Sequence, residues 1–149
     1  MTLAKGLGGG VPIAALLAKQ AYCVFAAGEQ GGTYGGNPLM TVVAHAVLQS
    51  VLSVDFLPSV RARSAQLEQG LAELAQQFGL GAVRGKGLLL ALDTAAVDAQ
   101  VIVQHCFAQG LLLNAPRPDT LRFVPALNVS ATEVDEMLTR LARVLSALN

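Results

Sequence analysis

Apolar side chains recur every three or four residues in three stretches of the chain, and this spacing predicts three amphipathic helices. The first helix is expected to begin at Asn37 and Pro38, because asparagine is a good N-cap and proline suits the first helical position. Gly79 follows the second stretch, as glycine often does at a helix end, and Ser130 with Glu133 forms a capping box before the last. The three stretches cover residues 39–54, 57–78 and 134–148.

The segment between the second and third stretches predicts a small sheet. A short apolar run at residues 88–92 is expected to be a strand, and Gly110 ends a predicted helix at 97–109. Two further strands, 111–114 and 120–124, flank a turn of the type rich in proline and aspartate. The order from about residue 83 is therefore β-α-β-β-α. Helices covering one face of such a sheet give an α+β layer domain.

The first third of the chain differs from the remainder in composition. Only three of the twenty charged residues, Lys5, Lys19 and Glu29, lie before residue 55, whereas nine of the fifteen glycines lie in residues 1–36. We therefore expect two parts, residues 1–54 and 55–149.

Overall composition excludes several classes of protein. Ten basic residues balance ten acidic ones, so no excess of positive charge is available for nucleic acid or an anionic membrane. The charged fraction is 13% and the apolar fraction 53%, which argues against disorder and suggests that part of the surface is covered by a partner. Lys5 is followed by glycines and not by the hydrophobic core of a signal peptide. The two cysteines, Cys23 and Cys106, do not have the spacing of a metal-binding or redox motif. A cytoplasmic protein is the expectation.

Two glycine-rich segments could carry chemistry. The first, residues 2–13, contains Lys5, whose amine could pair with a phosphate or attack an aldehyde. The second, residues 28–38, contains Thr33 and leads into the predicted helix start, where free N–H groups and the helix dipole favour an anion. A solvated lysine in a loose chain start and a plain loop before a capped helix are the alternatives.

Five blocks together resemble the class III (ornithine-type) aminotransferases, and most closely the members that act on acetylornithine. The resemblance implies a fold-type I enzyme, α/β overall, that uses pyridoxal 5'-phosphate and forms a homodimer. The blocks lie in order along the whole chain, at residues 2–13, 31–39, 83–88, 110–114 and 121–125.

The same resemblance implies roles for three residues. Lys5 would bind pyridoxal phosphate as a Schiff base and then move a proton as general base and acid. Thr33 would contact the cofactor phosphate across the dimer interface. Arg122 would receive a substrate carboxylate, a task that suits a planar guanidinium; a surface arginine at a strand end is the alternative.

Other residues of the family's site fall outside the matching blocks. In this family the aspartate that pairs with the pyridine nitrogen, an aromatic residue over the ring and a further substrate arginine lie upstream of the lysine. We therefore expect residues 1–54 to be the end of the large cofactor-binding domain with the start of the interdomain helix. Residues 55–149 would be the small C-terminal domain. Ala14, Glu29-Gln30 and Ala126 depart from the family's usual pattern. The chain alone is expected to be catalytically incomplete.

The expected reaction transfers an amino group from N-acetylornithine to 2-oxoglutarate, a step of arginine biosynthesis. Relatives that use ornithine, succinylornithine or 4-aminobutyrate share these motifs. The alternatives are a small domain that acts as a self-association or interaction module, and an anion-binding loop protein without Schiff-base chemistry. Packing or solvated roles are expected for His45, His105, Cys106, Arg84 and Lys86.

Overall fold

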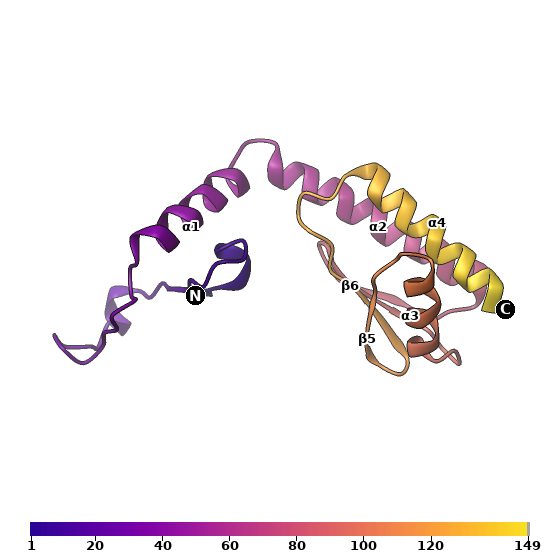
Figure 1. The fold of residues 1–149 in the computed structure, drawn as a ribbon, viewed down its shortest axis with the longest axis horizontal. Coiled ribbons are helices and arrows are strands. Elements are labelled where there is room, and N and C mark those ends of the chain that lie inside the picture. The colour runs from indigo at the N-terminus through magenta and orange to yellow at the C-terminus, as the bar shows by residue number, and fades with distance from the viewer. Residues whose placement is uncertain (149) are drawn as a thin grey trace. The chain divides into compact units, whose positions relative to one another are not determined.

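A computed structural model describes residues 1–148 of the chain (Figure 1). The chain divides into two compact units, Met1–Phe56 and a second that begins at Leu57. We refer to them as the first and second unit. The division lies two residues from the change in composition that the sequence shows.

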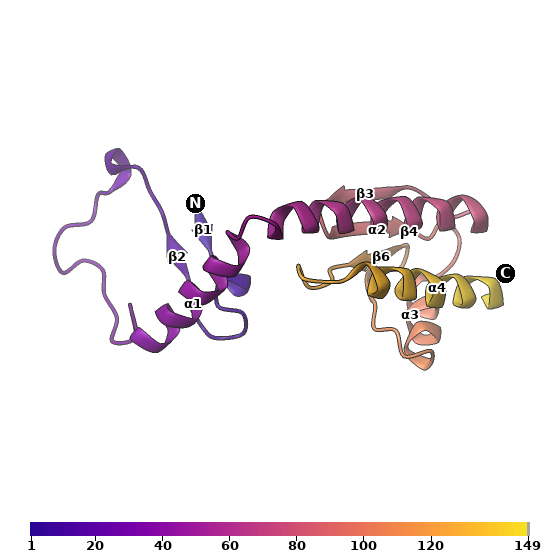
Figure 2. The ribbon, with the colours of Figure 1, turned by 90° about the horizontal axis from the view of Figure 1, so that it is seen from above.

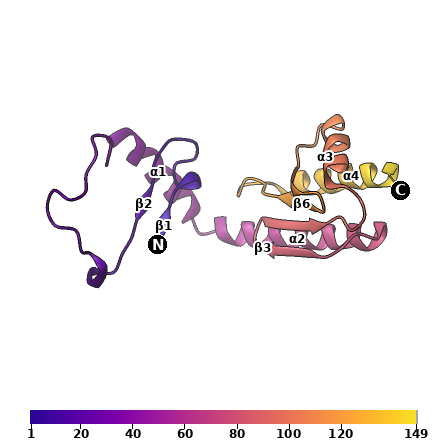
Figure 3. The same cartoon turned by 90° about the horizontal axis from the view of Figure 1, so that it is seen from below.

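The first unit holds a two-stranded antiparallel ladder and one long helix. Strands β1 (Thr2–Leu3) and β2 (Ala15–Leu16) pair, and the helix α1 spans Pro38–Val51 (Figure 3). Two short 3-10 helices lie at Lys5–Leu7 and Gln20–Tyr22. The predicted cap of α1 is confirmed, because the Asn37 side chain accepts hydrogen bonds from the two backbone N–H groups at positions 39 and 40.

The second unit is an antiparallel sheet with three helices. All pairings in the sheet are antiparallel, and the spatial order is β3-β4-β6-β5. Figure 2 labels β3, β4 and β6 of this sheet. The elements in chain order are α2 (Phe56–Phe78), β3 (Val83–Lys86), β4 (Leu89–Asp93), α3 (Ala99–Ala108), β5 (Asn114–Arg117), β6 (Thr120–Phe123) and α4 (Ala131–Leu148).

Two strand predictions were wrong in detail. The segment before β4 is itself a strand, β3, so the order is β-β-α-β-β-α. Gly85 in β3 has φ +142°, and Gly87 in the turn between β3 and β4 has φ +59°. Glycine adopts these backbone conformations readily, so the two glycines permit a tight hairpin. The second predicted strand, 111–114, begins only at Asn114 and includes Pro116, which is tolerated because β5 lies at the sheet edge.

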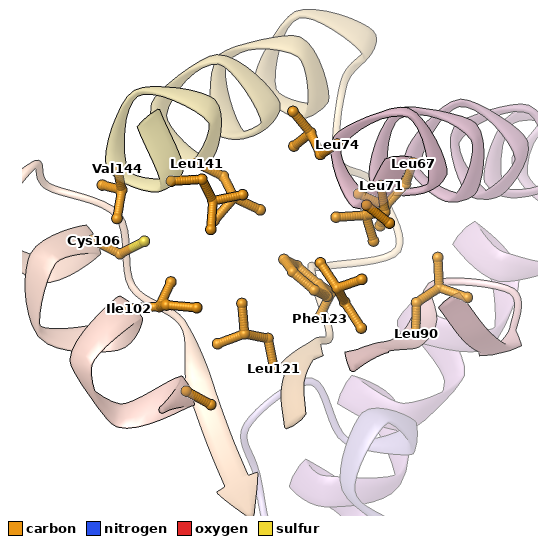
Figure 4. Packing of buried hydrophobic residues seen from close by; sticks show 14 of the residues in the cluster. Leu67, Leu71, Leu74, Leu90, Ile102, Cys106, Leu121, Phe123, Leu141 and Val144 are labelled. Carbon is orange, nitrogen blue, oxygen red and sulfur yellow. The ribbon is translucent and has the colours of Figure 1, made fainter. Parts of the chain in front are cut away.

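One face of the sheet packs against all three helices. Strand residues that point to that face pair in register, Leu90 with Phe123 and Leu92 with Leu121. Figure 4 shows Leu90, Leu121 and Phe123 among apolar side chains from the helices. Helices on one face of a small sheet confirm the predicted layer architecture. The helical contributions to this core include Leu67, Leu71 and Leu74 of α2, Ile102 and Cys106 of α3, and Leu141 and Val144 of α4.

Polar contacts tie α2 to the start of α4. The Gln66 side-chain amide on α2 donates to the carbonyl oxygen of Ala131 at 3.1 Å and to Asp135 at 2.6 Å. The capping box is confirmed: the backbone N–H and hydroxyl of Ser130 both donate to Glu133 at 2.7 Å, and the Glu133 N–H donates back to the Ser130 hydroxyl. These contacts fix the point where the chain leaves β6 and enters α4.

Candidate functional site

Lys5 begins the short 3-10 helix that follows β1. Its φ is +50°, in the left-handed region that non-glycine residues seldom adopt. Such a conformation costs about 1–3 kcal/mol and concentrates at functional sites. The side chain is exposed, and no hydrogen bond or ion pair holds its amine among residues 1–148. The amine is therefore free to meet a ligand.

The glycines after Lys5 form a tight turn. A Cβ at Gly8 would overlap the carbonyl oxygen of Val11, and Gly9 and Gly10 have φ of +57° and +122°. A Cβ at Gly9 would also lie 3.2 Å from the side chain of Val47 on α1. The glycine run thus allows the Lys5 segment to turn sharply and to approach α1 closely.

Thr33 lies in the second glycine-rich segment, in a turn just before α1. The turn is closed by hydrogen bonds from the Gly35 N–H to the Gly32 carbonyl and from the Asn37 N–H to the Tyr34 carbonyl. Thr33 is exposed, and within the described part of the chain its hydroxyl has no hydrogen-bond partner. This turn supplies a hydroxyl donor close in sequence to a helix N-terminus.

Arg122 lies on β6, on the face of the sheet that the helices leave uncovered. Its neighbours across the ladder are Ala91 on β4 and Asn114 on β5. It borders a largely apolar cavity of about 440 Å³ whose walls include Leu113 and Met137. Its guanidinium forms no ion pair with any of residues 1–148. The lining also includes Glu133. A guanidinium on the wall of a largely apolar cavity suits a carboxylate ligand.

The three candidate residues fall in different units. Lys5 and Thr33 belong to the first unit and Arg122 to the second, and no hydrogen bond links the first two residues in the described chain. Sequence reasoning missed one feature: Arg84 on β3 lies in the same register row as Arg122. The sequence signal for Arg84 was its position in the block 83–88. That position points to Arg122 only when residues 83–86 are known to form a strand paired with β4.

The donor set fits part of a pyridoxal phosphate site. A primary amine without a partner, a threonine hydroxyl without a partner and a glycine-rich turn before a helix match the groups that hold an aldehyde and a phosphate.

Among residues 1–148, no group of three histidine, cysteine, aspartate or glutamate side chains could hold a metal ion. No single helix in the described chain is long and apolar enough to cross a membrane.

Comparison with protein families and curated proteins gives consistent matches. The family model "Aminotransferase class-III" matches residues 1–145. Acetylornithine aminotransferase 2 of Bordetella parapertussis is 49% identical over 99% of this chain, and the acetylornithine aminotransferase of Ralstonia nicotianae is also 49% identical. This chain spans about 38% of the length of these curated relatives.

Solved structures agree with the sequence matches. N-acetylornithine aminotransferase from Stenotrophomonas maltophilia K279a superposes with a TM-score of 0.84 at 39% identity, over 99% of this chain and 39% of that chain. An ornithine aminotransferase of Toxoplasma gondii with partial occupancy of PLP at its active site superposes with a TM-score of 0.88 at 28% identity, over 98% of this chain and 36% of that chain. The fold of the chain is thus part of the mixed α/β fold of these enzymes.

Proposed function

This chain belongs to the class-III aminotransferases, and from that premise we propose that it carries the lysine, one phosphate contact and one carboxylate contact of an acetylornithine aminotransferase. The reaction would transfer an amino group from N-acetylornithine to 2-oxoglutarate in arginine biosynthesis, in the cytoplasm. The single observation behind the substrate is the 49% identity to acetylornithine aminotransferases over 99% of the chain. Ornithine, succinylornithine and 4-aminobutyrate are the other amino donors to be compared.

Lys5 would hold pyridoxal phosphate covalently through its amine. When bound, this cofactor supplies an electron sink that stabilises negative charge on the substrate carbon that loses its proton. The Lys5 Nζ would be the base that takes that proton and the acid that returns it. The strained backbone at Lys5 and its partner-free amine support this role.

Thr33 would donate its hydroxyl to an oxygen of the cofactor phosphate. The turn that carries it leads into the capped N-terminus of α1, where backbone N–H groups and the helix dipole favour negative charge. In the homodimer that we propose, this contact is made to the cofactor of the partner subunit. The exposed apolar side chains of the first unit, which include Tyr34 and Val42, would be covered in that assembly.

Arg122 would receive a carboxylate of the substrate. Its guanidinium presents parallel N–H donors that match two carboxylate oxygens. Its exposed position on the uncovered sheet face, without an ion-pair partner among residues 1–148, leaves those donors available.

The covalent role of Lys5 is tested by labelling. The chain is incubated with pyridoxal phosphate, reduced with borohydride and mapped by peptide mass spectrometry. We expect the label on Lys5 in preference to Lys19 and Lys86, the other two lysines. Lys5→Arg should abolish the selective label, and Lys19→Arg is the matched control that should retain it. Equal labelling of all three lysines would contradict the proposal for this chain.

Transferase activity is tested by exchanging segments. Since the chain matches about 38% of the relatives' length, it can replace the matching segment of the Bordetella parapertussis enzyme. We expect the exchanged enzyme to use N-acetylornithine in preference to 4-aminobutyrate, and Lys5→Arg to abolish turnover. A folded exchanged enzyme that binds the cofactor but prefers another donor would overturn the substrate assignment.

One observation favours a second candidate, an interaction module without catalysis. The second unit has a hydrophobic core of its own, so it could fold and bind a partner alone. This candidate predicts that association of the chain is unaffected by Lys5→Arg and that no lysine is labelled selectively.

A further inference from the structure

The uncovered face of the sheet carries a row of two arginines. Because strand side chains alternate between faces, residues next to the core-facing Leu90, Leu92 and Phe123 point to the opposite face. Arg84 on β3 and Arg122 on β6 both pair with Ala91 on β4, one from each side. The three residues thus form a cross-strand row in which a small side chain separates two guanidinium groups.

The Arg84 side chain reaches over β4 toward the strand of Arg122. Its Nη2 atom lies 3.5 Å from the hydroxyl oxygen of Thr120, two strands away. Thr120 is only 5% exposed although it lies on the uncovered face, two residues before Arg122 on β6. Ala91 has no side chain beyond Cβ to block this path. The guanidinium of Arg84 therefore reaches β6 two residues from Arg122.

Neither arginine forms an ion pair with a carboxylate among residues 1–148. The only ion pair in that part of the chain joins Arg140 and Glu136. Three carboxylates lie nearby, each accepting a hydrogen bond from another group: Asp93 from a backbone N–H at 2.8 Å, Asp119 from the Thr120 hydroxyl at 2.9 Å, and Glu133, on the wall of the cavity that Arg122 borders, from Ser130 at 2.7 Å. Their charges are a fixed background, and the charge of Arg84 acts on a ligand at Arg122 in addition to it. Two strand spacings put about 10 Å between the strands that carry Arg84 and Arg122, so the two charges act within about one Debye length of each other at about 0.1 M salt.

We infer that Arg84 is a specificity-determining residue that strengthens the carboxylate site at Arg122 through its charge. The inference rests on the proposed role of Arg122 in binding a substrate carboxylate. An added positive charge attracts a ligand in proportion to the ligand's net charge. It therefore favours an amino acceptor with two carboxylates over an amino donor whose carboxylate and ammonium groups cancel. Arg84 positions no reacting atom and is not itself a catalytic residue.

Two matched probes test this inference on the full chain without cofactor. Glutarate is a dianion, and 5-aminopentanoate is a zwitterion of similar length and zero net charge. Their dissociation constants are measured by NMR titration of the arginine side-chain signals at about 20 mM and 200 mM salt. The variants are Arg84→Gln, Arg84→Lys and Arg122→Gln, with Arg61→Gln on the exposed surface of α2 as the control of equal charge change.

Arg84→Gln should raise the dissociation constant of glutarate about threefold at low salt. It should raise that of 5-aminopentanoate by less than about 1.5-fold, because this probe has no net charge. The effect should shrink at high salt, and Arg84→Lys should restore most of the lost affinity because it keeps the charge. Equal effects of Arg84→Gln and Arg61→Gln would overturn the inference, as would failure of Arg84→Lys to restore binding in a folded chain. If Arg122→Gln leaves glutarate binding unchanged, the carboxylate role of Arg122 itself fails.

Discussion

The carbonyl oxygen of Leu89 on β4 lies so close to Gly85 on β3 that a Cβ at this position would overlap it. Gly85 also has φ +142°, a conformation that side chains seldom adopt. Only glycine therefore lets the two strands of this hairpin approach as they do. The arginine row on the uncovered face depends on that hairpin, because β3 carries Arg84.

Gly85→Ala should destabilise the second unit by about 3 kcal/mol or more, since the new methyl meets backbone and not a mobile side chain. The free energy of unfolding from urea titration measures the effect. Gly87→Ala is the matched control: its φ is also positive, at +59°, but no atom lies within 4 Å of its Cβ position. The control should lose only about 1–2 kcal/mol. Equal losses of stability in the two variants would contradict the predicted overlap with Leu89 and attribute the whole effect to the positive φ.

Arg140 on α4 closes the C-terminal end of α3. Its Nη1 atom donates to the carbonyl oxygens of Gln109 at 3.0 Å and Gly110 at 2.9 Å. Arg140→Gln should cost about 1 kcal/mol, because the site is partly exposed and water replaces some of the lost bonding. Arg143→Gln, one turn along the same helix at an exposed position, should leave the urea midpoint unchanged. A similar shift for both variants would mark a general charge effect.

Stability should depend on pH through Glu133. Hydrogen bonds from the backbone N–H and then the hydroxyl of Ser130 hold the pKa of Glu133 below its ordinary value of 4.5. A lowered native pKa means that the contribution is complete above pH 4.5 and is lost as the pH falls through the native value. Glu133→Gln should therefore lower the urea midpoint at pH 7 and matter less as the pH falls below 4.5. Glu68→Gln on α2 is the exposed control.

The two cysteines should differ sharply in reactivity. Cys106 is fully buried between α3 and the core, and burial raises the pKa of its thiol to about 11. Cys23 is exposed. A thiol reagent at pH 7.5 should label Cys23 rapidly and Cys106 only as fast as the second unit opens. Rapid labelling of Cys106 in the Cys23→Ser variant, without denaturant, would contradict the packing described for α3.

The helices were predictable because their ends carry local signals. Asn37 and Ser130 cap α1 and α4 as their sequence context indicates, and Gly79 follows α2 with φ +66°. β3 was not predictable, because its glycine is explained only by the close approach of Leu89, a contact between strands. Propensity describes residues one at a time, whereas a hairpin depends on pairs.

The candidate site was likewise predictable only in part. Lys5, Thr33 and Arg122 were identified by their place in recurring blocks of sequence, and their proposed roles remain to be tested. Arg84 received a solvated role because an exposed cation at a strand end has no local signal of function. Its alignment with Arg122 depends on the register of three strands, which no short stretch of sequence encodes.

The location of the core decides what calorimetry of this chain can detect. All the fully buried apolar side chains of the described chain except Ala44 belong to the second unit. The heat-capacity increment of unfolding follows the apolar surface that becomes exposed, so it should be near 1.2–1.5 kcal/mol/K, the value for roughly 100 residues, although the chain has 149. A thermal transition of the chain therefore reports the sheet and its three helices, and substitutions at Lys5 or Thr33 should leave it unchanged even where they abolish cofactor attachment.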